Sequence, residues 1–113
     1  MAESLARAAF IELDESMPIF LKIYGLTFFS IIHDLMNEPF HLHVAEGSNK
    51  LCKYWIFGDG SIELAESSGY KRAELKKIEK TLNENITFVI ERYKIYCNEN
   101  RIGVNFKTKR KKN

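Results

Sequence analysis

Residues 40–64 read FHLHVAEGSNKLCKYWIFGDGSIEL and decide the fold of the chain. Apolar residues alternate with histidines over 40–44, which is the two-residue period of a β-strand. Two further runs, at 51–57 and 62–64, are rich in β-branched and aromatic residues. Turn-forming segments separate the runs: EGSN at 46–49 and GDGS at 58–61. Because strands joined by short turns usually pair in antiparallel order, this stretch predicts a β-meander.

Toward the N-terminus, two more strand-like runs precede this stretch, IFLKIY at 19–24 and LTFFSII at 26–32. Gly25 separates them as a turn residue. Residues 34–39 read DLMNEP, and their Asp, Asn and Pro predict a loop. The meander is therefore predicted to have about four to five strands, over roughly residues 18–64.

After Tyr70 the hydrophobic period changes from two residues to three or four. The apolar positions form the buried stripe of an amphipathic helix: Leu75, Ile78, Leu82, Ile86, Phe88, Val89, Tyr93 and Tyr96. Ser67 and Ser68 precede it as capping residues. Residues 83–85 (NEN) have poor helix propensity and could split the helix, although one continuous helix over roughly 71–98 is expected. The predicted fold class is α+β, an antiparallel meander packed against a long C-terminal helix.

Composition divides the chain into a loosely ordered extension at 1–16, a single α+β domain at 17–106 and a basic disordered tail at 107–113. Met17 could serve as an alternative start of the chain. Residues 102–106 (IGVNF) predict a short strand before the tail. Six of the 17 basic residues and no acidic residue lie in the last 13 positions, which leaves the preceding 100 residues with a formal charge of −4.

Composition also limits the class of protein. No stretch approaches the ~20 apolar residues of a membrane-spanning helix, so no contact with a membrane is expected. Acidic residues interrupt the N-terminus, which lacks the pattern of a signal peptide and favours a cytoplasmic location. Cys52 and Cys97 have no metal-type spacing and are expected to be buried thiols, with a disulfide left open.

Several residues occur in an order found in a family of small bacterial proteins: Met17-Pro18, Gly25-Leu26, Asp34, Pro39-Phe40 and His41-Leu42-His43-Val44. Over residues 17–98 the chain resembles this family, the four-one-six-zero domain family, whose function is unknown. It departs from the family pattern at Leu42, which stands between the two histidines. Genes of the family often lie beside that of a second small protein, in arrangements like toxin–antitoxin pairs. The resemblance therefore implies a protein-interaction module that works with a cognate small protein.

The two histidines are the sharpest chemical feature of the sequence. Because His41 and His43 are two apart on a predicted strand, their side chains point the same way, about 7 Å apart at Cα. Together they could ligate one divalent transition metal, with Asp34 or the nearby His33 and Glu38 completing the site. Acid–base catalysis is a second use, as in a metal-assisted hydrolase or ribonuclease. A third is structural, in which the pair forms hydrogen bonds that hold the loop. No other cofactor is expected.

The remaining candidates concern partners. The tail could contact RNA or DNA weakly through its basic residues: Lys107, Lys109, Arg110, Lys111 and Lys112. Tyr54 and Trp55 are adjacent on a strand and must face opposite sides of the sheet, so one is core and the other could stack on a partner. A small sheet covered on one face leaves the other partly bare, which favours a homodimer or a cognate partner. Asp59 lies between two glycines and predicts a turn.

Overall fold

The computed structural model describes residues 17–108 of the chain. The predicted N-terminal extension at 1–16 and the last five residues of the basic tail lie outside this part. Five strands form one antiparallel sheet in the order β1-β2-β3-β4-β5, as predicted for the meander. The bounds of the strands are β1 Ile19–Ile23, β2 Leu26–Phe29, β3 His41–Glu46, β4 Lys50–Ile56 and β5 Ile62–Ser68.

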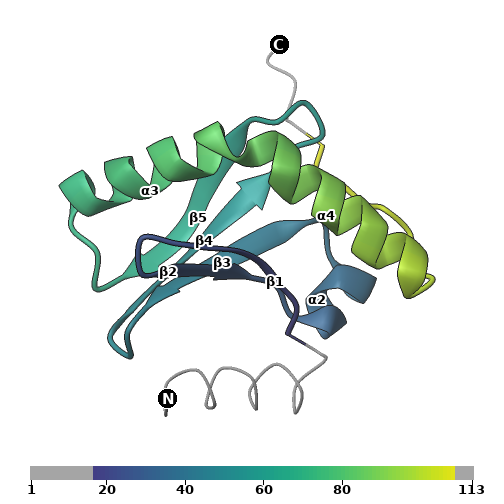
Figure 1. Cartoon of the computed structure of the whole chain (residues 1–113), viewed down its shortest axis with the longest axis horizontal. Helices are drawn as coiled ribbons and strands as arrows, with labels where there is room; N and C mark the ends of the chain where they lie inside the picture. The colour runs from purple at the N-terminus through teal and green to yellow at the C-terminus, as the bar shows by residue number, and fades with distance from the viewer. Residues whose placement is uncertain (1–16, 109–113) are drawn as a thin grey trace.

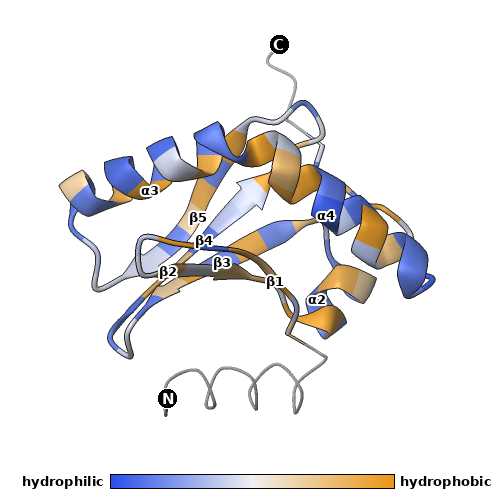
Figure 2. Ribbon diagram, in the orientation of Figure 1, coloured by the Kyte–Doolittle hydropathy of each residue, from blue (hydrophilic) through white to orange (hydrophobic). Residues whose placement is uncertain are grey.

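The C-terminal half is helical and lies across one face of the sheet (Figure 1). It consists of α3 (Arg72–Glu84) and α4 (Ile86–Glu99), and a shorter helix, α2 (Ile32–Asn37), lies between β2 and β3. Figure 2 shows α3 with hydrophilic residues on one side and hydrophobic residues on the other, as the sequence period requires. The predicted α+β class is confirmed.

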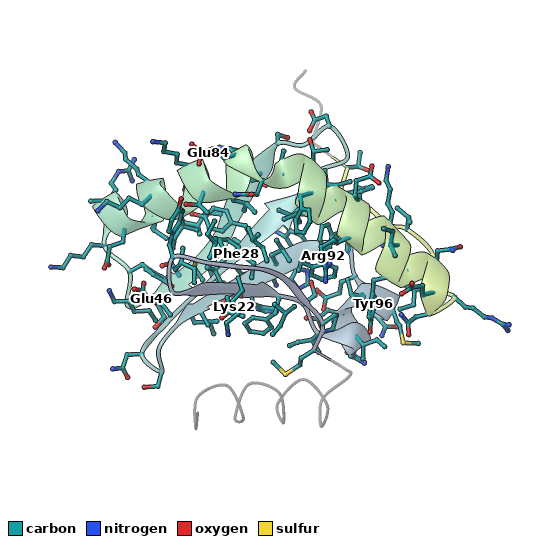
Figure 3. The ribbon with its side chains drawn as sticks, viewed as in Figure 1. Lys22, Phe28, Glu46, Glu84, Arg92 and Tyr96 are labelled. Atoms are coloured by element: carbon teal, nitrogen blue, oxygen red, sulfur yellow. The ribbon has the colours of Figure 1, made fainter. Side chains whose placement is uncertain are left out.

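The core fills the space between the sheet and the helices. Phe28 lies there (Figure 3), and Leu42, Val44 and Tyr54 are fully buried beside it. The helices contribute buried side chains to the same cluster: Ile78, Leu82, Val89, Tyr93 and Cys97. The hydroxyl of Tyr54 donates a hydrogen bond to Glu79 Oε2 at 2.7 Å, which ties β4 to α3. The inner face of the sheet is therefore covered, and the site lies on the outer face.

Residues 34–39 are predicted to be a loop, and this is wrong for residues 34–37. A six-residue helix, α2, covers Ile32–Asn37. Its Leu35 is 3% exposed, and the Asn37 side chain donates a hydrogen bond to the His33 carbonyl at 2.7 Å. One buried leucine and a few local hydrogen bonds hold a helix that is too short to show a period in the sequence.

The continuous helix expected over 71–98 is also corrected, because Asn85 divides it. The backbone of Asn85 leaves the helical region (φ −117°, ψ 14°) and its side chain donates to the Thr81 carbonyl at 2.8 Å. An Asn side chain competes with the backbone in this way, which accounts for its poor helix propensity. The break lets α4 change direction, and the stripe shifts so that Phe88 is 50% exposed instead of buried.

Two further corrections concern the ends of the helical half. Ser67 and Ser68 do not cap a helix; they extend β5, where they pair with Cys52 and Leu51. Instead, the Glu74 carboxylate accepts the Lys71 N–H at 2.8 Å at the start of α3. At the other end, the strand predicted over 102–106 does not form.

The C-terminal segment 102–108 instead packs against the core without regular structure. The backbone N–H of Asn105 donates to the Tyr93 hydroxyl at 2.7 Å, and the Asn105 carbonyl accepts the Phe40 N–H at 2.8 Å. The Phe106 ring lies edge-on to Phe40 and Tyr93, with centroids 6.3 and 5.4 Å away. Beyond Phe106, Lys107 reaches the outer face of the sheet, where its Nζ lies over the Trp55 ring.

Candidate functional site

The outer face of β3 carries both histidines, as the alternation predicts. Leu42 and Val44 point into the core, while His41 and His43 point the other way and their rings meet edge to face at 5.2 Å. Asp34, on α2, reaches the same point from the side. Of the three residues that could accompany the histidines, the structure brings Asp34 next to both of them.

One carboxylate oxygen joins the cluster. Asp34 Oδ2 is 3.1 Å from His41 Nε2 and 3.5 Å from His43 Nε2. The three side chains are largely sheltered, because those of His41, His43 and Asp34 are 1%, 16% and 19% exposed. Two imidazole nitrogens thus converge on one carboxylate oxygen in a place that solvent reaches only partly.

His41 has an acceptor at each of its ring nitrogens. Nδ1 lies 3.1 Å from the Pro39 carbonyl oxygen, and Nε2 faces Asp34. A neutral imidazole donates through one nitrogen only. If Nδ1 donates to Pro39, the lone pair of Nε2 faces the carboxylate, and the two repel unless a cation lies between them or a second proton is bound.

His43 differs from His41 in its hydrogen bonding. Its Nε2 is buried and makes no hydrogen bond within residues 17–108. Burial lowers the pKa of His43 below 6.5, and repulsion by His41 adds to the effect, while Asp34 partly offsets both. The ring stacks on Phe29 at 5.3 Å. The buried Nε2 of His43 therefore faces Asp34 Oδ2 at 3.5 Å, and the lowered pKa favours the neutral form of the ring.

The geometry of the cluster suits a metal ion. One ligand atom from each of Asp34, His41 and His43 lies within 4.8 Å of the other two. Tetrahedral ligands about 2.0–2.2 Å from Zn²⁺ lie about 3.3–3.6 Å apart, close to the observed 3.1 and 3.5 Å. The Pro39 carbonyl fixes His41 through its other nitrogen, which is how metal-ligating histidines are commonly oriented.

The other candidates for this site lie outside the cluster. His33 is exposed and turns toward Asn37, and the nearest Glu38 oxygen is 3.9 Å from His41 Nδ1, on the side away from Asp34. Cys52 and Cys97 are buried and free, as expected, and burial raises the pKa of Cys52 to about 12, which makes it a poor nucleophile. Asp59 accepts hydrogen bonds from Ser61 in the predicted turn.

Trp55 is the outward member of the predicted pair, and Tyr54 is core. Trp55 was not predicted to lie beside the histidines, although the short turn at 47–49 sets the register that pairs them. Glu46 pairs with Lys50 across that turn, and counting five residues along each strand pairs His41 with Trp55. Their rings meet at 5.1 Å. Lys107 of the basic tail lies over the same indole at 4.8 Å, while its other four basic residues lie outside the described part.

The lowered pKa of His43 predicts how stability responds to pH. The unfolded chain binds a proton on this residue near pH 6.5, whereas the folded protein binds it only at lower pH. Below about pH 6.5 the unfolded state holds more protons, so the free energy of unfolding falls as the pH falls toward the folded pKa. Urea unfolding in EDTA should show this loss in the wild type and a shallower one in His43→Gln. His33→Gln, at an exposed histidine, should keep the wild-type slope; equal slopes for His43→Gln and wild type would contradict the prediction.

The comparisons with known proteins give a family and no function. A family model described as a domain of unknown function, DUF4160, matches residues 25–94. No curated protein and no solved structure matches the chain. No helix within residues 17–108 has the length and apolar character to cross a membrane. The matched stretch includes Asp34, both histidines and Trp55, and it spans more than half of the 113 residues. The chain belongs to the DUF4160 family.

Proposed function

We propose that the protein binds one divalent transition-metal ion through Asp34, His41 and His43 and uses it for hydrolysis. The observation that carries this proposal is the convergence of both histidine Nε2 atoms on Asp34 Oδ2, at 3.1 and 3.5 Å. The Nε2 of His43 is buried without a hydrogen-bond partner within the described residues. An unpaired buried polar atom is costly, by about 1–3 kcal/mol, and a bound cation removes that cost.

The charge of the cluster favours a cation. The lowered pKa favours a neutral His43, and a neutral His41 that donates to Pro39 turns the lone pair of its Nε2 toward the carboxylate. A metal ion would be held by all three atoms at once. The alternative is a proton on His41, which would place a positive charge on one imidazole only. It would leave Nε2 of His43 without a hydrogen bond within residues 17–108.

The ligand set indicates the class of metal and of chemistry. Two imidazoles and one carboxylate suit Zn²⁺, Fe²⁺ and related ions, and three protein ligands leave at least one coordination position open. When bound, such an ion supplies Lewis-acid activation of a water molecule near neutral pH. In this arrangement the Pro39 carbonyl orients the His41 ring, α2 positions Asp34, and Phe29 holds His43 by stacking.

The test is metal binding by the full chain after removal of metal with EDTA. Titration calorimetry with Zn²⁺ and Co²⁺ should give one ion per chain, and the Co²⁺ absorption spectrum should report bound imidazole. His43→Ala and Asp34→Asn should each weaken binding by about a hundredfold or more. His33→Ala should bind like the wild type. The metal-loaded protein should hydrolyse a nitrophenyl phosphodiester faster than the His43→Ala variant. Absence of a bound ion, or equal affinity in His43→Ala, would remove the proposal.

A protein-interaction role stays a prediction. It is supported by β5, a seven-residue strand at the end of the sheet order that is exposed along nearly its whole length. The free edge of such a strand offers unpaired backbone groups to another chain. A cognate small protein or a second copy of this chain, as in toxin–antitoxin-like pairs, would find its hydrogen-bond partners there.

A further inference from the structure

We infer that the outer face of the sheet around Trp55 binds single-stranded nucleic acid by stacking a base on the indole. Trp55 projects from β4 away from the core and is only partly buried. Two ammonium groups lie over its ring, Lys53 Nζ at 5.0 Å and Lys107 Nζ at 4.8 Å from the centroid. An aromatic ring between cationic side chains is the pattern by which proteins hold unpaired bases and their phosphates.

The indole lies in a groove large enough for such a ligand. The groove has a volume of about 930 Å³ and runs between the outer side of β4 and β5 and the C-terminal segment. Its lining includes Trp55, Phe57 and Leu64 together with Lys107 and Thr108. The aromatic ring and its apolar neighbours match the base of a nucleotide, and the flexible cations match its phosphate.

Charge favours a nucleic acid over a neutral ligand once the chain beyond Thr108 is counted. Within the groove, Glu63 and Glu66 balance the two lysines, and Lys53 Nζ is 4.0 Å from a Glu66 oxygen. Thr108 lines the groove, and the next four residues in the sequence are Lys109, Arg110, Lys111 and Lys112. These four basic residues add four positive charges to the chain directly after the residue that lines the groove.

The ligand must be single-stranded. A base that stacks on Trp55 has to leave its pairing partner, so a duplex offers this ring nothing. A stacked base displaces one ammonium group from the indole, and that ammonium group is then free to contact a phosphate. Stacking of a base on an aromatic ring is the stronger of the two contacts at an exposed site, so the exchange favours binding.

The groove lies next to the candidate metal site but does not depend on it. The Trp55 ring contacts His41 at 5.1 Å, and His41 contacts His43 at 5.2 Å. A strand stacked on Trp55 would therefore lie one ring away from the Asp34 cluster. Binding can be measured in EDTA, where no metal is present, so failure of this inference and failure of the proposed metal site give different results.

The experiment uses the one tryptophan of the chain as its own reporter. The full chain in EDTA and low salt is titrated with fluorescein-labelled oligo(U) and oligo(dT) of ten nucleotides, followed by anisotropy, and with the unlabelled oligomers, followed by tryptophan fluorescence. Both single strands should bind and quench the tryptophan emission. Trp55→Leu should lower the affinity about tenfold. Lys107→Ala should reduce the salt dependence of log K by about 0.7, because one phosphate contact is lost.

Three controls make the inference falsifiable. Lys94→Ala removes the same charge from an exposed position on α4 and should bind like the wild type. Poly-glutamate carries charge without bases and should neither bind as tightly nor quench; equal binding would overturn the inference in favour of an acidic partner. Equal affinity for a duplex, or unchanged affinity in Trp55→Leu, would overturn it as well. If circular dichroism shows that Trp55→Leu does not fold, two other results still test the inference. Absence of quenching in the wild type, or an unchanged salt dependence of log K in Lys107→Ala, would overturn it.

Discussion

Phe40→Ala is expected to lower the free energy of unfolding by about 3–5 kcal/mol, the range for deleting a fully buried aromatic ring. Phe40 is 0% exposed, and its ring stacks on Tyr93 with centroids 3.8 Å apart and planes 5° from parallel. Phe20 and Phe106 close the cluster edge-on at 5.7 and 6.3 Å. Because one ring joins β1, α4 and the C-terminal segment, its loss opens a cavity that none of the three can fill alone.

The measurement is urea unfolding followed by circular dichroism, with two matched variants. Phe40→Leu keeps an apolar side chain and should cost about half as much or less. Phe88→Ala deletes the same ring from a position that is 50% exposed and should change stability by about 0.5 kcal/mol at most. The free energy of unfolding of a typical domain is only about 5–15 kcal/mol, so Phe40→Ala is expected to remove a large part of it. A cost equal to that of Phe88→Ala would show that the ring is not part of the core.

The second large effect is expected at Gly69, which joins β5 to α3. Its φ is +86°, and a Cβ built there would lie 2.5 Å from the backbone oxygen of Asn49 and 3.3 Å from Lys50 Cα. Neither contact is with the end of a flexible side chain, so the backbone of the β3–β4 turn or of β5 has to shift. We expect Gly69→Ala to cost about 2–4 kcal/mol, from the left-handed backbone and the overlap together.

Gly47→Ala separates the two causes. Gly47 also has a positive φ, +65°, but a Cβ at this position meets nothing within 4 Å. Gly47→Ala should lower the free energy of unfolding only by the cost of the left-handed backbone conformation, about 1–2 kcal/mol. Urea unfolding of the two variants side by side gives the cost of the overlap as their difference. If Gly69→Ala is no less stable than Gly47→Ala, the close approach to Asn49 has no energetic weight.

Local patterns in the sequence were sufficient for the sheet. Alternation over 40–44 put both histidines on one face, and the turn residues after Glu46 and Phe57 set the order of the strands. These features depend on residues that are neighbours in the chain. The inner and outer faces of β3 and β4 could therefore be assigned before any contact between distant residues was known.

What the sequence did not reveal depends on distant contacts or on very short segments. The helix α2 covers six residues, fewer than two turns, and its Asp and Asn resemble turn residues. The division at Asn85 and the packing of 102–108 follow from how α4 and Phe106 meet the core. For the site, the histidine pair was predictable, but the position of Asp34 beside it was only one of several choices, since it depends on α2.

The hydrogen bonds between Tyr93 and Asn105 have a consequence for where this protein can be cut. The stretch by which the chain is assigned to its family ends at residue 94, before the asparagine that the tyrosine holds. That stretch begins at residue 25 and so also omits Phe20, which is 3% exposed. A recombinant fragment trimmed to the family boundaries would leave Phe40 and Tyr93 facing water on two sides. The stretch matched by the family model, residues 25–94, is thus shorter than the stretch that is needed to cover the hydrophobic core.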